Sequence, residues 1–430
     1  MADYLAMRVP LLDLAEQYRA LSEPIREAID EVLGNHRFIL GPKVHAFEKA
    51  IAAYCNAPHA AGVSSGTDAL LAILMALGIG SGDAVITTPY TFFATAGCIA
   101  RVGASPVFAD IDPETYNISA SAIRECIEKN CQMDSDGAWR TKSGEKIRAI
   151  IAVHLFGLCC DLAALHEISK RFQLDLIEDA AQALGAESPF RGRTIKAGTI
   201  GEIGFFSFYP SKNLGAAGDA GMILCRDEPM AGKLRAIRNH GMSPRRSLGA
   251  GGELRYFHHV IGGNFRLDEI QAAILNVKLP FLEKWAADRR AAADFYRAEF
   301  VRAELTARIV LPAEPYRDRG LMNHHVYHQY VIRAPMRDAL REHLGKREIG
   351  TAIYYPLGLH EQNVLRISAT TKAISPRPSA PRAKPWRCQF IRKYHAKHSV
   401  MWLGQSRTST AEGTFVISGG SRAIPLINDE

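Results

Sequence analysis

Short apolar runs alternate with amphipathic stretches along the first half of the chain. The runs are rich in β-branched and aromatic residues, and each lies near a segment whose apolar residues recur at helical spacing. In order they read AVITTPY, SPVFADI, IRAIIAVHLFG, LDLIEDA, GEIGFFSFYP and AGMILCRD. Strands that alternate with helices predict βαβ units, so we expect an α/β fold whose central sheet is mostly parallel and flanked by helices.

The pattern differs on either side of this region. The stretch DLAEQYRALSEPIREAIDEVL predicts a first helix, and a long helical segment is expected from Arg266 to about Phe300. Between the strands and that helix lies RRSLGAGGELRYFHH, which is polar and glycine-rich, while VYHQYVIRA and GTAIYYPLG predict later strands. We therefore expect a large domain over residues 1–245, a small α+β domain over 246–362 and a separate tail over 363–430.

Composition and charge exclude several classes of protein. Apolar runs are broken well short of a membrane span, the N-terminus lacks the pattern of a signal peptide, and the eight cysteines show neither metal-ligand spacing nor a disulfide framework. The net charge of +7 is confined to residues 363–430, which hold 11 of 52 Lys and Arg and 3 of 45 Asp and Glu, leaving 41 basic and 42 acidic groups elsewhere. We expect a cytoplasmic protein without a metal, a membrane or a nucleic acid as partner, in which Cys159 and Cys160 are structural.

A possible anion site follows the first predicted strand, in GVSSGTDALLAILMALGIG. Ser64, Ser65 and Thr67 are candidate N-caps of a helix, and Gly66 would let the backbone approach a ligand. The free amides at a helix N-terminus suit a phosphate group, although the same pattern is typical of an ordinary capped helix.

Two ionisable residues end later apolar runs. Asp179 closes LDLIED, and a carboxylate at the end of a buried strand requires a cation or hydrogen bonds, unless it merely caps a helix. Gln182 would project from the same side of the turn. Lys212 follows GFFSFYPS, where an apolar setting would lower its pKa and favour the free amine of Schiff-base chemistry; the alternative is a lysine that extends into water. A phosphate seat, a buried carboxylate and a reactive amine together are the parts that pyridoxal 5′-phosphate (PLP) needs.

The chain resembles the DegT/DnrJ/EryC1/StrS family of sugar aminotransferases, a branch of the fold-type I PLP enzymes. The motifs run in order over roughly residues 8–362: VPLLDLAEQY, RFILGPKVHAFE, SSGTDAL, TTPYTFFATAG, EDAAQALGAE, GFFSFYPSKNLGAAGDAG, GGNFRLDEIQAAIL and YYPLGLHEQ. The resemblance implies transfer of an amino group from L-glutamate to a keto nucleotide-linked sugar, in polysaccharide or secondary-metabolite biosynthesis. The lysine at position 212 sets the chain apart from the dehydratase members.

The resemblance also implies roles for individual residues. Lys212 matches the Schiff-base lysine that moves the α-proton, and Asp179 the partner of the pyridine nitrogen. The other matches are Gln182 beside the ring hydroxyl, Phe92 stacked on the ring, and Ser65, Gly66, Thr67 and Ser207 at the phosphate. Asn264 matches a residue that reaches the phosphate from the other subunit of a homodimer, and His328, Tyr355 and His360 fall where sugar contacts are usual. Taken alone, Phe92 would be assigned to the core, and His154 is expected to pack beside the site.

The resemblance stops at Gln362. Restoring a single G after the codon for Gln362, with suitable synonymous codons, turns the following residues into Gln-Glu-Cys-Phe-Ala-Asp-Leu-Gly. The same frame then yields YHKGDFPETERA, RETLALPIYPEI and RDVVGPIADFYR, which look like the family's C-terminus. Our hypothesis is a one-base deletion near codon 362, which leaves the small domain incomplete and makes the basic tail an accident of translation. The alternatives are a disordered tail, a family member that binds PLP without turnover, and a DNA-binding regulator, for which no helix-turn-helix pattern is found.

Overall fold

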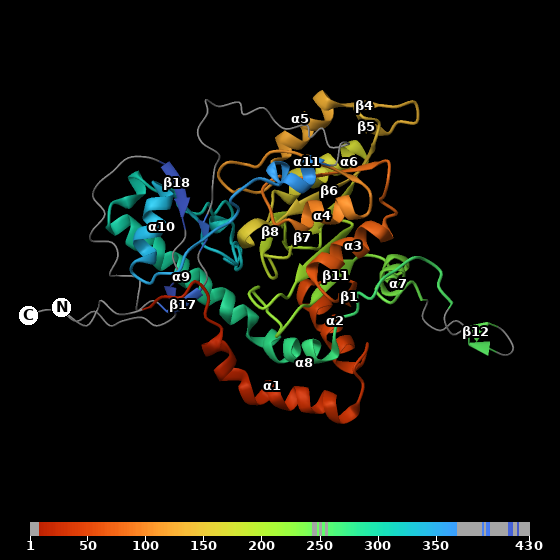
Figure 1. The fold of residues 1–430 in the computed structure, drawn as a ribbon, viewed down its shortest axis with the longest axis horizontal. Coiled ribbons are helices and arrows are strands. Elements are labelled where there is room, and N and C mark those ends of the chain that lie inside the picture. Colours follow the sequence, from red (N-terminus) through yellow and green to blue (C-terminus); the bar gives the residue numbers. More distant parts are fainter. Residues whose placement is uncertain are drawn as a thin grey trace, which may run out of the picture.

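A nine-stranded sheet forms the centre of the molecule (Figure 1). The computed structural model describes residues 8–242 and 257–367 and, outside them, only the backbone of a few short strands. The sheet order is β1-β11-β10-β7-β6-β2-β3, and the β4–β5 hairpin extends it beside β6. Its strands are β1 (His59–Val63), β2 (Asp83–Thr87), β3 (Ser105–Phe108), β4 (Cys131–Met133), β5 (Trp139–Thr141), β6 (Lys146–Val153), β7 (Asp175–Asp179), β10 (Ile203–Ser207) and β11 (Gly221–Cys225).

Most neighbouring strands of this sheet run in the same direction. The pairs β10–β7, β7–β6, β6–β2 and β2–β3 are parallel, whereas β11 is antiparallel to both β1 and β10. Both faces are buried, because adjacent residues of one strand enter different hydrophobic cores: Ile150 belongs to one core and Ile151 to the other. The α/β class with a mostly parallel sheet is thereby confirmed.

Helices cover the sheet, some directly and others through a neighbouring helix. They are α1 (Ala15–Asn35), α2 (Pro42–Cys55), α3 (Gly66–Ala76), α4 (Ala94–Arg101), α5 (Ala120–Asn130), α6 (Leu162–Phe172), α7 (Glu228–Ile237), α8 (Glu269–Lys278) and α9 (Leu282–Arg302). The first predicted helix is confirmed as α1, which packs along α8 (Figure 1). The single long helix expected from Arg266 to about Phe300 is wrong: a 3₁₀ turn at Leu279–Phe281 separates α8 from α9, because Pro280 cannot donate a helical hydrogen bond.

The remaining elements are short. They are the hairpin β8 (Glu187–Phe190) and β9 (Arg193–Lys196), then β14 (Ile332–Pro335), α10 (Arg337–Gly345), β15 (Ala352–Ile353) and α11 (Asn363–Ile367), with 3₁₀ turns at Leu155–Gly157, Leu305–Ala307, Arg317–Arg319 and Leu359–Glu361. The short strands β12 (Ser247–Leu248), β13 (Gly252–Glu253), β16 (Gln389–Phe390), β17 (Lys393–His395), β18 (Glu412–Phe415) and β19 (Gly419–Gly420) complete the set, and β14 pairs with both β16 and β18.

Some predicted segments lie outside the described residues. Only residues 332–334 of the predicted strand VYHQYVIRA form a strand, as part of β14. Most of the stretch around 243–256 and of the tail beyond 367 is not described. Within the described residues, no helix is both long and apolar enough to cross a membrane.

Candidate active site

The parallel strands bring their carboxyl ends to one edge of the sheet. Ser64 follows β1, Asp179 ends β7 and Ser207 ends β10. Ligands of open α/β sheets bind at this edge, and the residues of the predicted site reach it from segments far apart in the sequence.

The N-terminus of α3 lies directly against the end of β10. Ser65 is the N-cap, and its Oγ accepts a hydrogen bond from the Asp68 N–H at 3.0 Å. Gly66 begins the helix, and a Cβ at this position would lie 2.8 Å from the Cβ of Ser207. Glycine therefore allows the helix terminus and Ser207 to lie in close contact, beside the exposed Thr67. A dianionic group fits this arrangement of main-chain amides and hydroxyls.

Asp179 carries a buried carboxylate at the centre of the site. Its Oδ1 accepts a hydrogen bond from the Ala181 N–H at 3.1 Å, and its Oδ2 accepts one from the Thr95 hydroxyl at 3.2 Å. Burial raises the pKa of Asp179, while the Ala181 amide, the charge of Lys212 and the Thr95 hydroxyl act in the opposite direction. The fold thus brings Lys212 close enough to Asp179 for the two charges to interact, and a further cation would stabilise the carboxylate.

Gln182 and Phe92 lie around this carboxylate on different elements. The Oε1 of Gln182 accepts a hydrogen bond from the Phe156 N–H at 2.7 Å, and its Nε2 donates to the Tyr355 hydroxyl at 3.4 Å. Phe92 is 59% exposed, so its assignment to the core from sequence alone is wrong. Its carbonyl accepts the Thr95 N–H, and the same turn therefore places both the aromatic ring and the hydroxyl that binds Asp179. An exposed ring beside a buried carboxylate suits a flat ligand that is stacked on one face.

The three candidate substrate residues lie in different surroundings. Tyr355 contacts the site through its hydrogen bond with Gln182. His360 packs against Phe108 at the end of β3, with ring centroids 6.2 Å apart. His328 is 1% exposed, and its carbonyl accepts a hydrogen bond from Arg289.

Asn264 is exposed in the segment that runs beside β1. The next residue, Phe265, accepts the Ser64 N–H at 2.9 Å, so this segment is attached to the chain just before the N-cap of α3.

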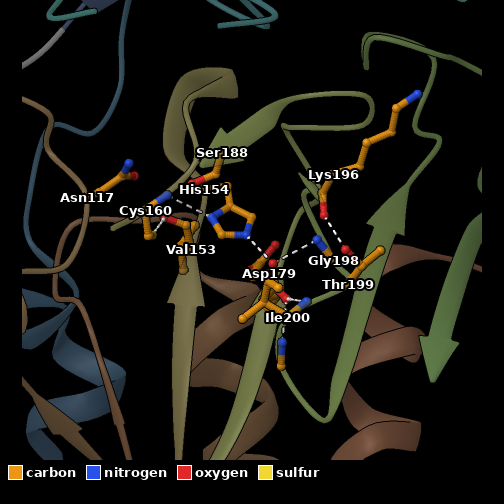
Figure 2. A network of polar contacts seen from close by, with 12 residues as sticks. Asn117, Val153, His154, Cys160, Asp179, Ser188, Lys196, Gly198, Thr199 and Ile200 are labelled. Carbon is orange, nitrogen blue, oxygen red and sulfur yellow. Dashed lines mark hydrogen bonds and ion pairs between the residues drawn. The ribbon is translucent and has the colours of Figure 1, made fainter. Parts of the chain in front are cut away.

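His154 and Glu178 form a fully buried pair. Figure 2 shows His154 between Cys160 and the segment that holds Gly198 and Ile200. The Cys160 N–H donates to Nδ1 of His154 at 3.1 Å, which leaves the hydrogen on Nε2 to be donated to Glu178 at 2.9 Å. The Glu178 carboxylate also accepts the N–H groups of Gly198, Ile200 and Gly201. Burial would raise the pKa of Glu178, but the hydrogen bonds from His154 and these amides lower it overall.

This network braces the strands that carry the site. The main-chain N–H of His154 donates to the main-chain carbonyl of Asp179 at 3.0 Å, which joins the end of β6 to the end of β7. His154 is therefore structural, as expected. Cys159 and Cys160 are likewise buried and free, and Cys160 contributes its N–H to the network.

Replacing Glu178 by glutamine should destabilise the fold by about 3 kcal/mol, because an amide cannot accept all of these hydrogen bonds and leaves buried N–H groups unpaired. The free energy of unfolding from urea titration measures the effect. The matched control is Glu167→Gln on the surface of α6. The side chain of Glu167 is 72% exposed, so this substitution should change the free energy of unfolding little.

The same network predicts how stability depends on pH. Because the pKa of Glu178 is lowered in the folded state, the stability that its carboxylate contributes is present at neutral pH and is lost as pH falls through the folded pKa. An unchanged free energy in the glutamine variant would contradict this role.

Comparisons with known proteins agree with the geometry. The sequence model of the DegT/DnrJ/EryC1/StrS aminotransferase family matches residues 19–380, so the similarity extends beyond Gln362, where the motifs alone predict that it stops. The "Pleiotropic regulatory protein" of Geobacillus stearothermophilus is 45% identical over 83% of this chain and 87% of its own length. The UDP-N-acetyl-3-dehydro-alpha-D-glucosamine 3-aminotransferase of Acidithiobacillus ferrooxidans is 39% identical over 84% of this chain and 88% of its own length.

Solved structures are similar over most of the chain. A DegT DnrJ EryC1 StrS aminotransferase from Brucella abortus superposes with a TM-score of 0.76 at 33% identity and covers 89% of this chain and 93% of its own. The NtdA protein of Bacillus subtilis, with bound cofactor PMP, gives a TM-score of 0.70 at 26% identity and covers 89% of this chain and 80% of its own. These similarities confirm the expected fold type.

Proposed function

Because this chain belongs to the DegT/DnrJ/EryC1/StrS aminotransferase family, we propose that it uses PLP to transfer the amino group of L-glutamate to a keto group of a nucleotide-linked sugar in the cytoplasm. One observation carries the proposal: the buried carboxylate of Asp179 ends β7 at the carboxyl edge of the sheet, where it accepts hydrogen bonds from Thr95 and Ala181, and the charge of Lys212 opposes the rise in its pKa that burial causes. The name of the Acidithiobacillus relative supports a nucleotide-sugar substrate.

The residues at this edge fit PLP. Its phosphate would bind the N-terminus of α3 and Ser207, where Gly66 keeps the surface open. Its pyridine nitrogen would face Asp179, its ring hydroxyl Gln182, and one face of its ring the exposed Phe92. When bound, this cofactor supplies an electron-accepting ring conjugated to the reacting amine.

Two residues of the chain would carry the proton chemistry. Asp179 would remain ionised and hold a proton on the pyridine nitrogen, since the opposite charge offsets the cost of burying its carboxylate. Lys212 would hold the cofactor and, once released as a free amine, take a proton from the substrate carbon and return it.

Thr95 should matter for cofactor affinity because its hydroxyl binds Asp179, although Thr95 itself is not proposed to contact the cofactor. In Thr95→Val the hydroxyl is lost with little change in shape, so we expect the pKa of Asp179 to rise and the Kd for PLP to increase about tenfold. Fluorescence titration of the apoprotein with PLP measures this. Thr95→Ser keeps the hydroxyl and should bind nearly as the wild type does. Equal Kd values for the valine and serine variants would argue against the hydrogen bond.

A second copy of the chain would complete the site. The exposed Asn264 is proposed to contact the phosphate bound by the other protomer, as the family resemblance implies. Sedimentation velocity should then give a homodimer, and Asn264→Ala should weaken PLP binding without unfolding the chain.

The proposed function is tested on purified protein loaded with PLP. Glutamate should bleach the visible absorbance, and borohydride reduction followed by peptide mapping should place the cofactor on Lys212. A panel of keto nucleotide sugars then identifies the acceptor. An adduct on another residue of well-folded protein would end the proposal.

A second possibility is a family member that binds PLP without turnover because its C-terminus is out of frame. The Geobacillus relative aligns over 83% of this chain and 87% of its own length, so part of each chain has no counterpart in the other. A tail that replaces a family segment would leave such unmatched parts, but the family model still matches up to residue 380. The same relative is named a regulatory protein, but the presence of Lys212 and Asp179 at one edge of the sheet favours an enzyme.

A further inference from the structure

Lys278 lies where a positive charge is costly. It is the last residue of α8, and it is 7% exposed. Burial lowers the pKa of Lys278 to about 8. Among residues 8–242 and 257–367 it forms no ion pair with a carboxylate. A buried ammonium without an opposite charge is rare, and it calls for an explanation other than stability.

The ammonium of Lys278 binds the loop that carries Lys212. Its Nζ donates a hydrogen bond to the Gly215 carbonyl at 2.5 Å. The loop is tightly folded at this point, because a Cβ on Gly215 would lie 2.2 Å from the Pro210 carbonyl oxygen. The Ala216 N–H returns to the Phe208 carbonyl at 2.8 Å, so the segment around Lys212 forms a closed turn.

A second residue of α8 binds the same loop. The Oε1 of Gln271 accepts the Ala217 N–H at 2.9 Å. Gln271 and Lys278 are two helical turns apart and therefore lie on the same face of α8. Next to Lys212 in the sequence, the Nδ2 of Asn213 donates to the Val326 carbonyl at 3.1 Å.

Helix α8 is itself firmly anchored at its first turn. Glu269 is 1% exposed, and its carboxylate accepts the N–H groups of Gly41, Lys43 and Val44 at the start of α2. Because α8 also packs along α1, Lys278 extends from a rigid support. A hydrogen bond from a charged donor is about twice as strong as a neutral one, which suits a contact that must fix a loop.

We propose that Lys278 is a positioning residue whose buried ammonium holds the loop bearing Lys212 at the edge of the sheet. This inference rests on the proposed function of Lys212 as the amine that binds the cofactor. This role explains why a charged residue occupies a buried position where an apolar residue would destabilise the fold less. The fold is less stable than it could be, but the position of the reactive amine is fixed.

Lys278→Met tests this, because methionine keeps the stem and removes the ammonium. Hydrogen exchange of the apoprotein should show the amides of residues 212–217 exchanging at least about tenfold faster, and the Kd for PLP should rise about tenfold. Lys278→Arg should restore much of the protection. The control is Lys284→Met on α9, whose side chain is 71% exposed and which should behave as the wild type.

Thermal unfolding separates positioning from simple packing. A packing residue would lower the melting temperature when replaced, whereas Lys278→Met should leave it unchanged or raise it at pH 7. In the wild type the pKa of Lys278 is about 8 in the folded state and 10.5 in the unfolded state. Between these pH values the folded state binds fewer protons than the unfolded state, so the stability of the fold rises with pH. The methionine variant should lack that rise.

The outcomes are distinct. Unchanged exchange in the loop, or loss of protection spread over the whole chain with a lower melting temperature, would overturn the positioning role, as would an arginine variant no better protected than methionine. If borohydride places PLP on a residue other than Lys212, the proposed function fails, and the positioning role fails with it even if the loop exchanges faster. Faster loop exchange with PLP on Lys212 supports both.

Discussion

Lys212→Ala should lower kcat/KM for amino-group transfer at least about 1,000-fold, because no other amine interacts with Asp179 at this edge in the described part of the chain. Lys212→Arg should be nearly as poor, since a guanidinium does not release its proton in proteins. Single-turnover assays with glutamate measure the loss. The free energy of unfolding should change little, because the side chain is only half-buried.

The charge of Lys212 has a second effect that does not depend on catalysis. It lowers the pKa of Asp179, so the alanine variant should show a higher pKa for this carboxyl in the apoprotein. Lys129→Ala on α5 is a suitable control, since its side chain is 69% exposed and pairs with Glu125. Transfer activity in Lys212→Ala comparable to that of the control would contradict the assignment.

Restoring one nucleotide after codon 362 should have the largest effect on stability. We expect soluble yield and transfer activity to increase severalfold and the melting temperature to rise by about 10 °C, because the family-like segment LALPIYPEI supplies an apolar strand where the present tail reads as a polar, basic sequence. We expect this segment to lie beside β14, whose Ile332 belongs to the same hydrophobic core as Leu344 of α10.

The control for this experiment keeps the present frame and changes only synonymous codons over the same bases. Sequencing the gene from its source decides whether the deletion is in the DNA. A restored chain that is less stable and less active than the present one would refute the hypothesis of a lost base.

The alternation of apolar runs and helical segments was enough to predict the central sheet, because parallel strands buried on both faces leave a strong local signal. The same logic placed Asp179 and Lys212 at strand ends, and the fold brings them together. One error was local: Pro280 was visible in the sequence, and it breaks the long helix.

Other features depend on contacts that no local pattern encodes. Phe92 looks like a core residue in sequence, and only its position on the turn before α4 leaves it exposed. Thr95 carries no signal of its own, since its role comes from Asp179 on a distant strand. Glu178 offered a hint, because a charged residue within an apolar strand must find partners, but His154 and the Gly198–Gly201 amides were not predictable.

The direction of β11 has a consequence for how the reactive lysine is presented. Since β11 runs back beside β10, the two strands are joined by a direct reversal of the chain rather than by a crossing helix. Helix α8, which comes later in the sequence, binds this reversal through Gln271 and Lys278. The proposed position of Lys212 therefore depends on contact between the segment after β10 and α8, which are far apart in the sequence, so the site forms only after both segments have folded together.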